Sequence, residues 1–257
     1  MSGTDRTKAA DWSPEGPVSI LVEPQMGENI GAAARAMWNF GLRQMRIVNP
    51  RDGWPNPAAV AMASGAGGLL DEARVFATTA EAVADLHMVY ATTARPREMA
   101  KNVMTPERAM AHARELVANG KRVGILYGRE RTGLENDDVV RANAIVTVPV
   151  NPAFASLNLA QCVLLMSYEW RRQHDETPAE VLSAGKSEPA LSGEVDRMLD
   201  HLEAELEAAN FFWPAHKKPS MAANLRNLFR RAPLTDQDVR TLWGVVRALA
   251  EGPRRRG

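Results

Sequence analysis

Short runs rich in β-branched residues alternate with helix-forming runs about six times through the first 172 of the 257 residues. This alternation predicts an α/β fold, with helices on both faces of a parallel sheet, because parallel strands need a crossover between them. Ligands of such sheets bind beyond the carboxyl ends of the strands. A site is therefore expected in the loops at residues 23–31, 92–101, 128–133 and 149–158.

Local patterns place the individual elements. The predicted strands are Val18–Val22, Met45–Val48, Arg74–Phe76, His87–Ala91, Arg122–Tyr127 and Ala144–Val148. The predicted helices are Asn29–Phe40, Pro57–Ser64, Thr79–Ala84, Thr105–Asn119 and Asn136–Arg141. The glycines within residues 65–68 are expected to break the second of these helices.

A proline-containing loop then leads into a further helix. Pro149 and Pro152 prevent the last strand from continuing, and Ser156 stands where the N-cap of the following apolar run is expected. Backbone N–H groups at such a helix start are suited to holding a ligand at the carboxyl edge of the sheet. An ordinary strand-to-helix turn explains the same pattern.

The two ends of the chain differ from this α/β region. Residues 1–16 are polar and are expected to form a flexible arm, residues 17–172 form the α/β domain, and residues 173–192 have the composition of a linker. From residue 193 to residue 257, apolar side chains recur at helical spacing. This periodicity predicts a small all-helical extension of about three helices.

Charge is unevenly distributed, although the formal net charge is +0. Residues 175–207 carry 2 basic and 10 acidic side chains, net −8, whereas residues 208–257 carry 10 basic and 3 acidic side chains, net +7. A basic tail favours a polyanionic partner. On charge alone, a solvated surface with charges of both signs is the simpler interpretation.

The sequence argues against several classes of protein. Its five histidines include no pair at metal-ligand spacing, so no metal is expected, and its single cysteine, Cys162, is expected to be buried and inert. No run has the length of a membrane span and the N-terminus has no apolar signal-peptide core, which predicts a cytoplasmic protein. Walker, dinucleotide-binding and hydrolase-elbow motifs are missing.

Three segments carry candidate site residues. Asn29 lies at the start of the first helix, and Arg35 follows nearly two turns later as a lone charge among small residues. Gly128–Glu130 come directly after a strand, and the glycine would let a ligand approach the backbone. Arg95 and Arg97 follow another strand and suit phosphate oxygens. Taken alone, each segment also fits solvated surface charge or a surface salt bridge.

Taken together, the segments resemble the SPOUT class of RNA methyltransferases, and most closely the TrmH-like ribose 2′-O-methyltransferases. The resemblance rests on Asn29–Arg35, Gly124–Leu134, Asn151–Pro152 and Ser156–Ala160, which have the order and spacing of that family. It continues into the tail through Asn224–Arg231 and covers nearly the whole chain. It implies a SPOUT fold with a deep trefoil knot in the C-terminal part of the α/β domain, which general topology rules would argue against.

The resemblance also implies a cofactor and a catalytic set. The cofactor would be S-adenosylmethionine, with S-adenosylhomocysteine as product, and its expected contacts are Thr92, Thr93, Ala94, Gly128, Val148, Ala155, Ser156 and Leu157. The expected catalytic residue is Arg35, with the ribose and the guanidinium oriented by Asn29, Glu130, Ser156 and Asn158. A guanidinium is a poor base. Either an RNA phosphate helps Arg35 take the 2′-hydroxyl proton, or Arg35 stabilises the developing alkoxide while another acceptor takes it.

The partners implied by the resemblance are tRNA and a second copy of the chain. The most similar members of the family methylate cytidine or uridine at position 32 of the tRNA anticodon loop, and others modify other tRNA or rRNA nucleotides. The side chains expected to contact RNA are Arg95, Arg97, Arg226, Arg230 and Arg231. A non-catalytic RNA-binding protein with the same fold is the competing interpretation, and the intact catalytic set speaks against it.

Overall fold

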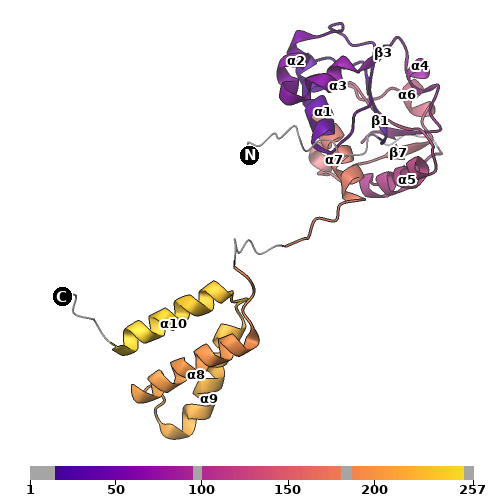
Figure 1. Ribbon diagram of the computed structural model, residues 1–257. Coiled ribbons are helices and arrows are strands. Elements are labelled where there is room, and N and C mark those ends of the chain that lie inside the picture. The colour runs from indigo at the N-terminus through magenta and orange to yellow at the C-terminus, as the bar shows by residue number, and fades with distance from the viewer. Residues whose placement is uncertain (1–14, 95–99, 181–186, 252–257) are drawn as a thin grey trace. The chain divides into compact units, whose positions relative to one another are not determined.

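A computed structural model describes residues 15–94, 100–180 and 187–251 of the chain (Figure 1). The contacts within it divide the chain into two compact units, Met1–Glu176 and Thr177–Gly257. The first unit contains the α/β elements and the second contains only helices. The candidate site loops named above all belong to the first unit.

The first unit is built on a seven-stranded parallel sheet with the strand order β3-β2-β1-β6-β4-β7-β5. The strands are β1 Val18–Val22, β2 Met45–Val48, β3 Arg74–Phe76, β4 Met88–Thr92, β5 Asn102–Met104, β6 Val123–Tyr127 and β7 Ala144–Val146. Six of them confirm the predicted strands to within two residues. The sequence patterns miss β5, because Val103 is its only β-branched residue. This strand lies at the edge of the sheet and pairs with β7 alone.

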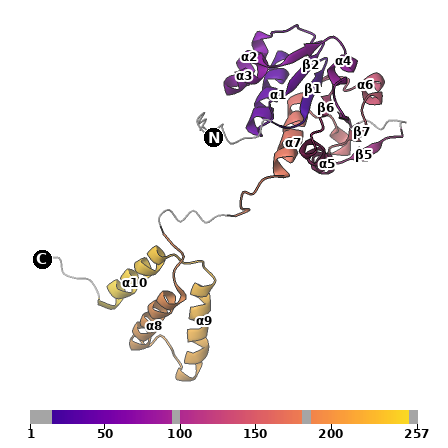
Figure 2. The ribbon, with the colours of Figure 1, turned by 45° about the vertical axis from the view of Figure 1, so that its right-hand side comes forward.

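Helices cover both faces of the sheet, as predicted (Figures 1 and 2). The helices of this unit are α1 Gly27–Asn39, α2 Pro57–Ala63, α3 Gly67–Asp71, α4 Thr79–Val83, α5 Pro106–Ala118, α6 Asn136–Val140 and α7 Leu159–Arg172. Successive strand residues point to opposite faces, so Leu21 joins the core with α1, α2, α3, α5 and α7, whereas Ile20 joins the core with α4 and α6.

Small residues let α1 pack closely on α2. A methyl group added to Gly31 would lie 2.3 Å from the carbonyl oxygen of Ala59, so only glycine permits this contact. Helix α2 starts as the sequence predicts, because the side chain of Asn56 accepts hydrogen bonds from the N–H groups of Ala58 and Ala59, and Pro57 occupies the first turn. The alanine-rich segment is therefore a packing surface along most of its length.

One expectation about a helix boundary is wrong, whereas the expected end of α2 before its glycines is confirmed. The N-cap of α7 is Asn158 and not Ser156, because the side-chain oxygen of Asn158 accepts from Ala160 N at 2.8 Å and from Gln161 N at 3.4 Å. The side chain of Gln161 accepts from Asn158 N in return, which completes a capping box. Among the glycines expected to break α2, Gly67 begins the short helix α3.

The connection from β7 to α7 carries the part of the chain for which a knot is implied. Strand β7 lies between β4 and β5, and the chain then passes through a short 3₁₀ turn at Pro152–Phe154 to α7. Helix α7 packs against α1 and α5. The sheet and its helices agree with a SPOUT fold, and the trefoil knot stays a prediction.

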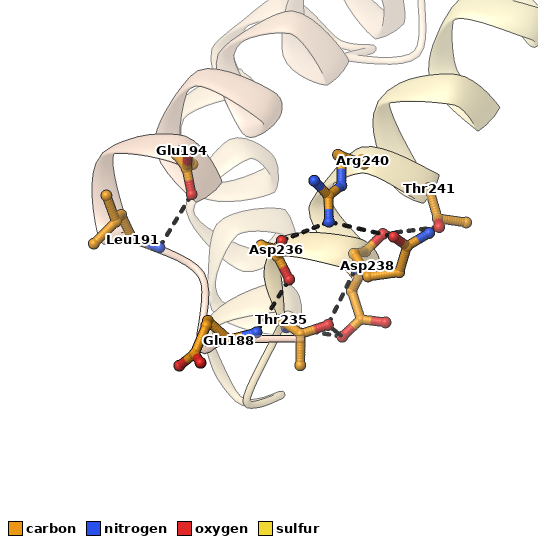
Figure 3. A network of polar contacts seen from close by, with 9 residues as sticks. Glu188, Leu191, Glu194, Thr235, Asp236, Asp238, Arg240 and Thr241 are labelled. Atoms are coloured by element: carbon orange, nitrogen blue, oxygen red, sulfur yellow. Dashed lines mark hydrogen bonds and ion pairs between the residues drawn. The ribbon is translucent and has the colours of Figure 1, made fainter. Parts of the chain in front are cut away.

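The described part of the second unit contains three α-helices, which confirms the expected helical extension. These are α8 Ser192–Ala208, α9 Lys218–Arg230 and α10 Asp236–Glu251. Val195, Met198 and Leu199 of α8 share a small core with Val239 of α10. The start of α10 is fixed by its own side chains, because Asp238 accepts hydrogen bonds from the N–H and the hydroxyl group of Thr235 (Figure 3).

A partly buried ion pair ties β2 to the segment after α4. The side chain of Arg46 is 7% exposed and donates to both carboxylate oxygens of Asp85, at 2.5 and 2.8 Å. It also donates to the carbonyl oxygen of Ala82 at 2.6 Å. The Arg46 hydrogen bond lowers the pKa of Asp85 to about 2. The pair therefore stabilises the fold fully above the unfolded-state pKa of about 4, and its contribution is lost as the pH falls toward 2.

The substitution Asp85→Asn should lower the free energy of unfolding. Breaking a buried pair costs about 3–5 kcal/mol, and the 36% exposure of Asp85 reduces this to about 2 kcal/mol. Urea denaturation at pH 7 measures the difference, which should shrink between pH 4 and pH 2. Asp52→Asn is the control, because its pair with Arg51 is solvent-exposed. Equal stability of wild type and Asp85→Asn would contradict the assignment.

Candidate active site

A cavity of about 420 Å³ lies where strands β4, β6 and β7 end. This is the carboxyl edge of the sheet, where the sequence predicts the site. All eight residues expected to contact a cofactor line it, namely Thr92, Thr93, Ala94, Gly128, Val148, Ala155, Ser156 and Leu157. The expected catalytic residues Glu130 and Ser156 also line it, whereas Asn29, Asn158 and Arg35 do not.

The carboxylate of Glu130 joins the cavity to the start of α1. It accepts hydrogen bonds from the backbone N–H groups of Gln25 at 2.8 Å and Met26 at 3.1 Å, and from Asn29 Nδ2 at 2.9 Å. Helix α1 has no side-chain cap of its own. The negative charge therefore lies at the positive end of α1, where it is favourable.

The same network reaches the start of α7. Asn29 Oδ1 accepts a hydrogen bond from Asn158 Nδ2 at 2.9 Å, and the side-chain oxygen of Asn158 caps α7. A chain of three polar side chains thus connects the β6 loop, α1 and α7. Asn29 and Asn158 thus do not line the cavity, but their hydrogen bonds hold Glu130 and the α7 start in position.

Arg129 makes a second set of contacts that the sequence reasoning missed. Its side chain is 11% exposed and binds Glu23 through two nitrogens, at 2.7 and 2.9 Å, while Asp138 lies 3.4 Å away. Burial alone would lower the pKa of Arg129, but the hydrogen bond and charge of Glu23, with Glu135 and Asp138, raise it overall. Arg129 therefore stays charged and fixes the loop after β6 to the end of β1.

Gly128 has a different role from the one expected. A methyl group added to it would lie 2.2 Å from the backbone of Gly133 and Leu134. The loop after β6 folds back on itself. Glycine is required at position 128 because the backbone of this loop passes so close to it. Gly128 also lines the cavity, so the tight loop shapes the cavity wall.

The titratable groups of the cavity limit its acid–base chemistry. Burial raises the pKa of the Cys162 thiol to about 11 and raises the pKa of Tyr127 well above its ordinary value. Both groups stay protonated at neutral pH, which agrees with the expected inert thiol. Among the described residues that line the cavity, Glu130 is the only carboxylate. It already accepts three hydrogen bonds.

Arg35 is exposed on α1, on the part of the helix that faces away from the sheet. No described residue forms an ion pair or hydrogen bond with it. A guanidinium left unpaired at the surface is available to a partner, but it is not placed against its own cavity.

The arginines expected to contact RNA have different surroundings. Arg95 and Arg97 lie outside the described residues. Arg226 pairs with Asp200 at 2.5 Å and with Glu203 at 2.7 Å, and Arg230 pairs with Asp196 at 2.5 Å. These carboxylates belong to α8 of the same unit. Arg231 is exposed.

Neither a metal-binding cluster nor a membrane-spanning helix is found within the described ranges. No group of three or more histidine, cysteine, aspartate or glutamate side chains is placed there to hold a metal ion. In the same ranges, none of the helices combines the length and apolar character that crossing a membrane requires.

Comparison with known proteins accounts for both units. Residues 17–168 match the model of the SpoU rRNA Methylase family, and residues 193–256 match that of the TrmJ tRNA methyltransferase C-terminal domain. A tRNA (cytidine/uridine-2′-O-)-methyltransferase TrmJ from Klebsiella pneumoniae is 34% identical over 238 residues, which is 90% of this chain and 95% of the relative. A tRNA (cytidine/uridine/adenosine-2′-O-)-methyltransferase TrmJ from Pseudomonas aeruginosa is 35% identical over 236 residues, 88% of this chain and 91% of the relative.

A solved structure is also similar. The crystal structure of TrmJ from Z. mobilis ZM4 has a TM-score of 0.82 and 49% sequence identity, and the match covers 92% of this chain and 100% of that chain. The chain therefore belongs to the SpoU rRNA methylase family and, within it, to the TrmJ-type methyltransferases. This confirms the family indicated by the sequence motifs.

The substitution Glu130→Gln should loosen the start of α1. An amide offers one acceptor oxygen, and its NH₂ group faces N–H donors, so the loss should be about 1–3 kcal/mol of unfolding free energy. Hydrogen exchange should accelerate at Gln25 and Met26. Glu72→Gln is the control, because Glu72 is exposed at the end of α3. Unchanged protection of residues 23–30 in Glu130→Gln would refute the capping role.

Proposed function

We propose that this protein transfers a methyl group from S-adenosylmethionine to a ribose 2′-hydroxyl of tRNA, at cytidine or uridine 32 of the anticodon loop. The observation that carries the proposal is the cavity at the ends of β4, β6 and β7, which is lined by all eight residues expected to bind the cofactor. Full-length relatives that are tRNA 2′-O-methyltransferases by name support the substrate class. A tRNA substrate would place the protein in the cytoplasm.

The cavity fits the proposed cofactor in size and chemistry. Its volume of about 420 Å³ lies within the range of about 300–1,000 Å³ that is typical of small-molecule sites. Apolar side chains of Val146, Val148, Leu157 and Leu159 line it together with backbone groups of three loops. Such a lining can enclose an adenosine while the backbone groups fix its orientation.

The protein needs to supply little covalent catalysis for this reaction. A bound cofactor would supply a methyl carbon activated by a sulfonium. The C–O bond would form as the S–C bond breaks to leave S-adenosylhomocysteine, and the hydroxyl proton would pass to an RNA phosphate or to solvent. The chain must therefore orient the ribose, exclude water and stabilise the charge that develops on oxygen. Glu130, Asn29 and Asn158 hold the cavity wall in place for this task. Arg35 is the cation that stabilises the developing alkoxide.

Arg35 is brought to the reaction by a second copy of the chain. It is exposed on α1, and it does not line the cavity of its own subunit. Exposed apolar side chains surround this surface, with Trp38 on α1 at 38% exposure, and Leu164 and Tyr168 on α7 at 40% and 47%. Adjacent exposed apolar groups on two packed helices are typical of a subunit interface. A homodimer through α1 and α7 would cover them and place Arg35 in the interface.

Arg35→Ala should reduce methyl transfer by on the order of 100-fold or more, because one preorganised donor of charge stabilisation is lost. Binding of S-adenosylmethionine should be unchanged. The assay uses radiolabelled S-adenosylmethionine with unmodified tRNA, and calorimetry measures cofactor binding. Arg141→Ala, at an exposed arginine after α6, is the control. Full turnover in Arg35→Ala would remove Arg35 from the mechanism, and no transfer by the wild type to any RNA would favour the non-catalytic alternative.

The nucleotide is identified in the same experiment. Nuclease digestion of the labelled tRNA followed by mass spectrometry should locate the methyl group at ribose 32. The Pseudomonas aeruginosa relative includes adenosine in its name, so tRNA substrates with each of the four bases at position 32 should be compared. A methyl group at another position would support the proposed reaction and show that a different nucleotide is methylated.

Leu164→Glu should convert the homodimer into monomers and abolish methyl transfer, because a carboxylate would be buried without a partner in the α1–α7 interface. Analytical ultracentrifugation measures the assembly. Val140→Glu is the matched control, because Val140 is a similarly exposed apolar residue on α6, on the other face of the sheet. A Leu164→Glu protein that sediments as a dimer would contradict the proposed interface.

A further inference from the structure

The second unit needs RNA-binding side chains other than Arg226 and Arg230. Both of these arginines are held by carboxylates of α8. A guanidinium in such pairs must exchange a protein partner for a phosphate, so it gains little from binding RNA. The contacts should come from groups that the folded unit leaves unpaired.

One segment of the unit presents aromatic and basic groups together. We call residues 210–217, between α8 and α9, the aromatic–basic loop. Trp213 is 79% exposed and Phe211 is 51% exposed, whereas Phe212 between them is 8% exposed. His216 and Lys217 follow and are exposed. Among the described residues, no carboxylate pairs with either of them.

The backbone of the loop is anchored, and one of its two exposed rings, that of Phe211, packs against a buried neighbour. Phe211 N donates to the carbonyl oxygen of Leu206 at 2.9 Å, and Lys217 N donates to that of Pro214 at 2.9 Å. Phe212 is buried and its ring packs edge-on against Phe211, with 5.3 Å between ring centroids. A fixed ring loses little conformational entropy when it binds a ligand.

The exposed side chains of the loop contribute little to the stability of the unit. An indole that is 79% exposed buries little apolar surface. Lys217 precedes the first turn of α9, at the helix end where a cation is unfavourable. Flat apolar rings beside a lysine match the chemistry of unpaired nucleotides, whose bases stack on aromatic side chains and whose phosphates attract cations.

We propose that the aromatic–basic loop is a stacking platform for an unpaired nucleotide of the tRNA substrate. Trp213 stacks on the base, Phe211 extends the platform, and Lys217 with His216 contacts the adjoining phosphates. The proposal rests on the proposed function, because it names where the second unit binds the same RNA. The charge of Lys217, beside two exposed rings, favours RNA over a protein as the occupant.

The test measures binding of unmodified tRNA to full-length variants by fluorescence anisotropy. Trp213→Ala should weaken binding about tenfold, the size expected for the loss of one stacked base. Trp213→Phe should restore binding to within about threefold, because phenylalanine retains a ring for stacking. Trp213→Leu should behave like Trp213→Ala, because it keeps apolar surface without a ring. Leu249→Ala is the control, because Leu249 is also 79% exposed.

Kinetics and salt dependence provide a second readout. Trp213→Ala should raise the KM for tRNA while kcat at saturating tRNA and the KM for S-adenosylmethionine stay unchanged. Lys217→Ala should reduce the slope of log affinity against log salt by about one, the effect of one lost phosphate contact.

Three results would overturn the platform. If Trp213→Ala binds tRNA with wild-type affinity, the platform proposal is wrong, whereas the proposed methyltransferase function is unaffected. Full activity and tRNA binding in Trp213→Leu would show that a ring is not needed. A changed sedimentation coefficient in Trp213→Ala would assign the loop to contacts between copies of the chain. Failure of the wild type to bind or methylate tRNA would instead refute the proposed function, and the platform with it.

Discussion

The carboxylate of Glu130 fixes the relation between segments that lie far apart in the sequence. A parallel sheet positions its strands through backbone hydrogen bonds, but it leaves the loops at its carboxyl edge free to move independently. Glu130 removes this freedom by accepting two backbone N–H groups and one amide from the start of α1. Asn29 also accepts a hydrogen bond from Asn158, so the start of α7 is held in the same network. Hydrogen bonds to an ionised acceptor are about twice as strong as neutral ones, which suits a partly exposed site.

Arg129 and Glu130 brace the same loop from opposite directions. Arg129 binds Glu23 at the end of β1 and lies near Asp138 of α6, whereas Glu130 binds the start of α1. Glu23 has a φ of +45°, a left-handed conformation that costs a non-glycine residue about 1 kcal/mol or more. Its two hydrogen bonds with a nearly buried guanidinium offset that cost. Two adjacent charges of opposite sign can therefore fix one loop to two neighbours.

The sequence predicts the sheet well because buried parallel strands are nearly continuous apolar runs, as in Val18–Val22. It fails at β5, whose residues are mostly exposed at the sheet edge. It also assigns the N-cap of α7 to Ser156 instead of Asn158, because serine and asparagine are both good N-cap residues. The side chain of Gln161, three residues after Asn158, completes a capping box with it and so decides between the two positions. The cavity-lining residues were identified through family resemblance, since local pattern alone left each segment open to a surface interpretation.

Long-range pairing explains the remaining failures. From the sequence, Arg129 is a charge in a turn, and only the fold shows that Glu23 reaches it across more than a hundred residues. The net charge of the tail is misleading for the same reason. Residues 177–257 carry 12 basic and 11 acidic side chains, net +1, and α8 supplies the carboxylates that occupy Arg226 and Arg230.

This neutrality bears on the RNA binding that we propose for the second unit. A strongly basic module could attract any polyanion from a distance, and its binding would be weakly selective. A folded unit with paired arginines and net charge near zero has little such attraction. Its affinity must come from close contacts at a few unpaired groups, which depend on the shape of the RNA. Unpaired bases in a tRNA loop offer that shape, whereas a regular duplex does not.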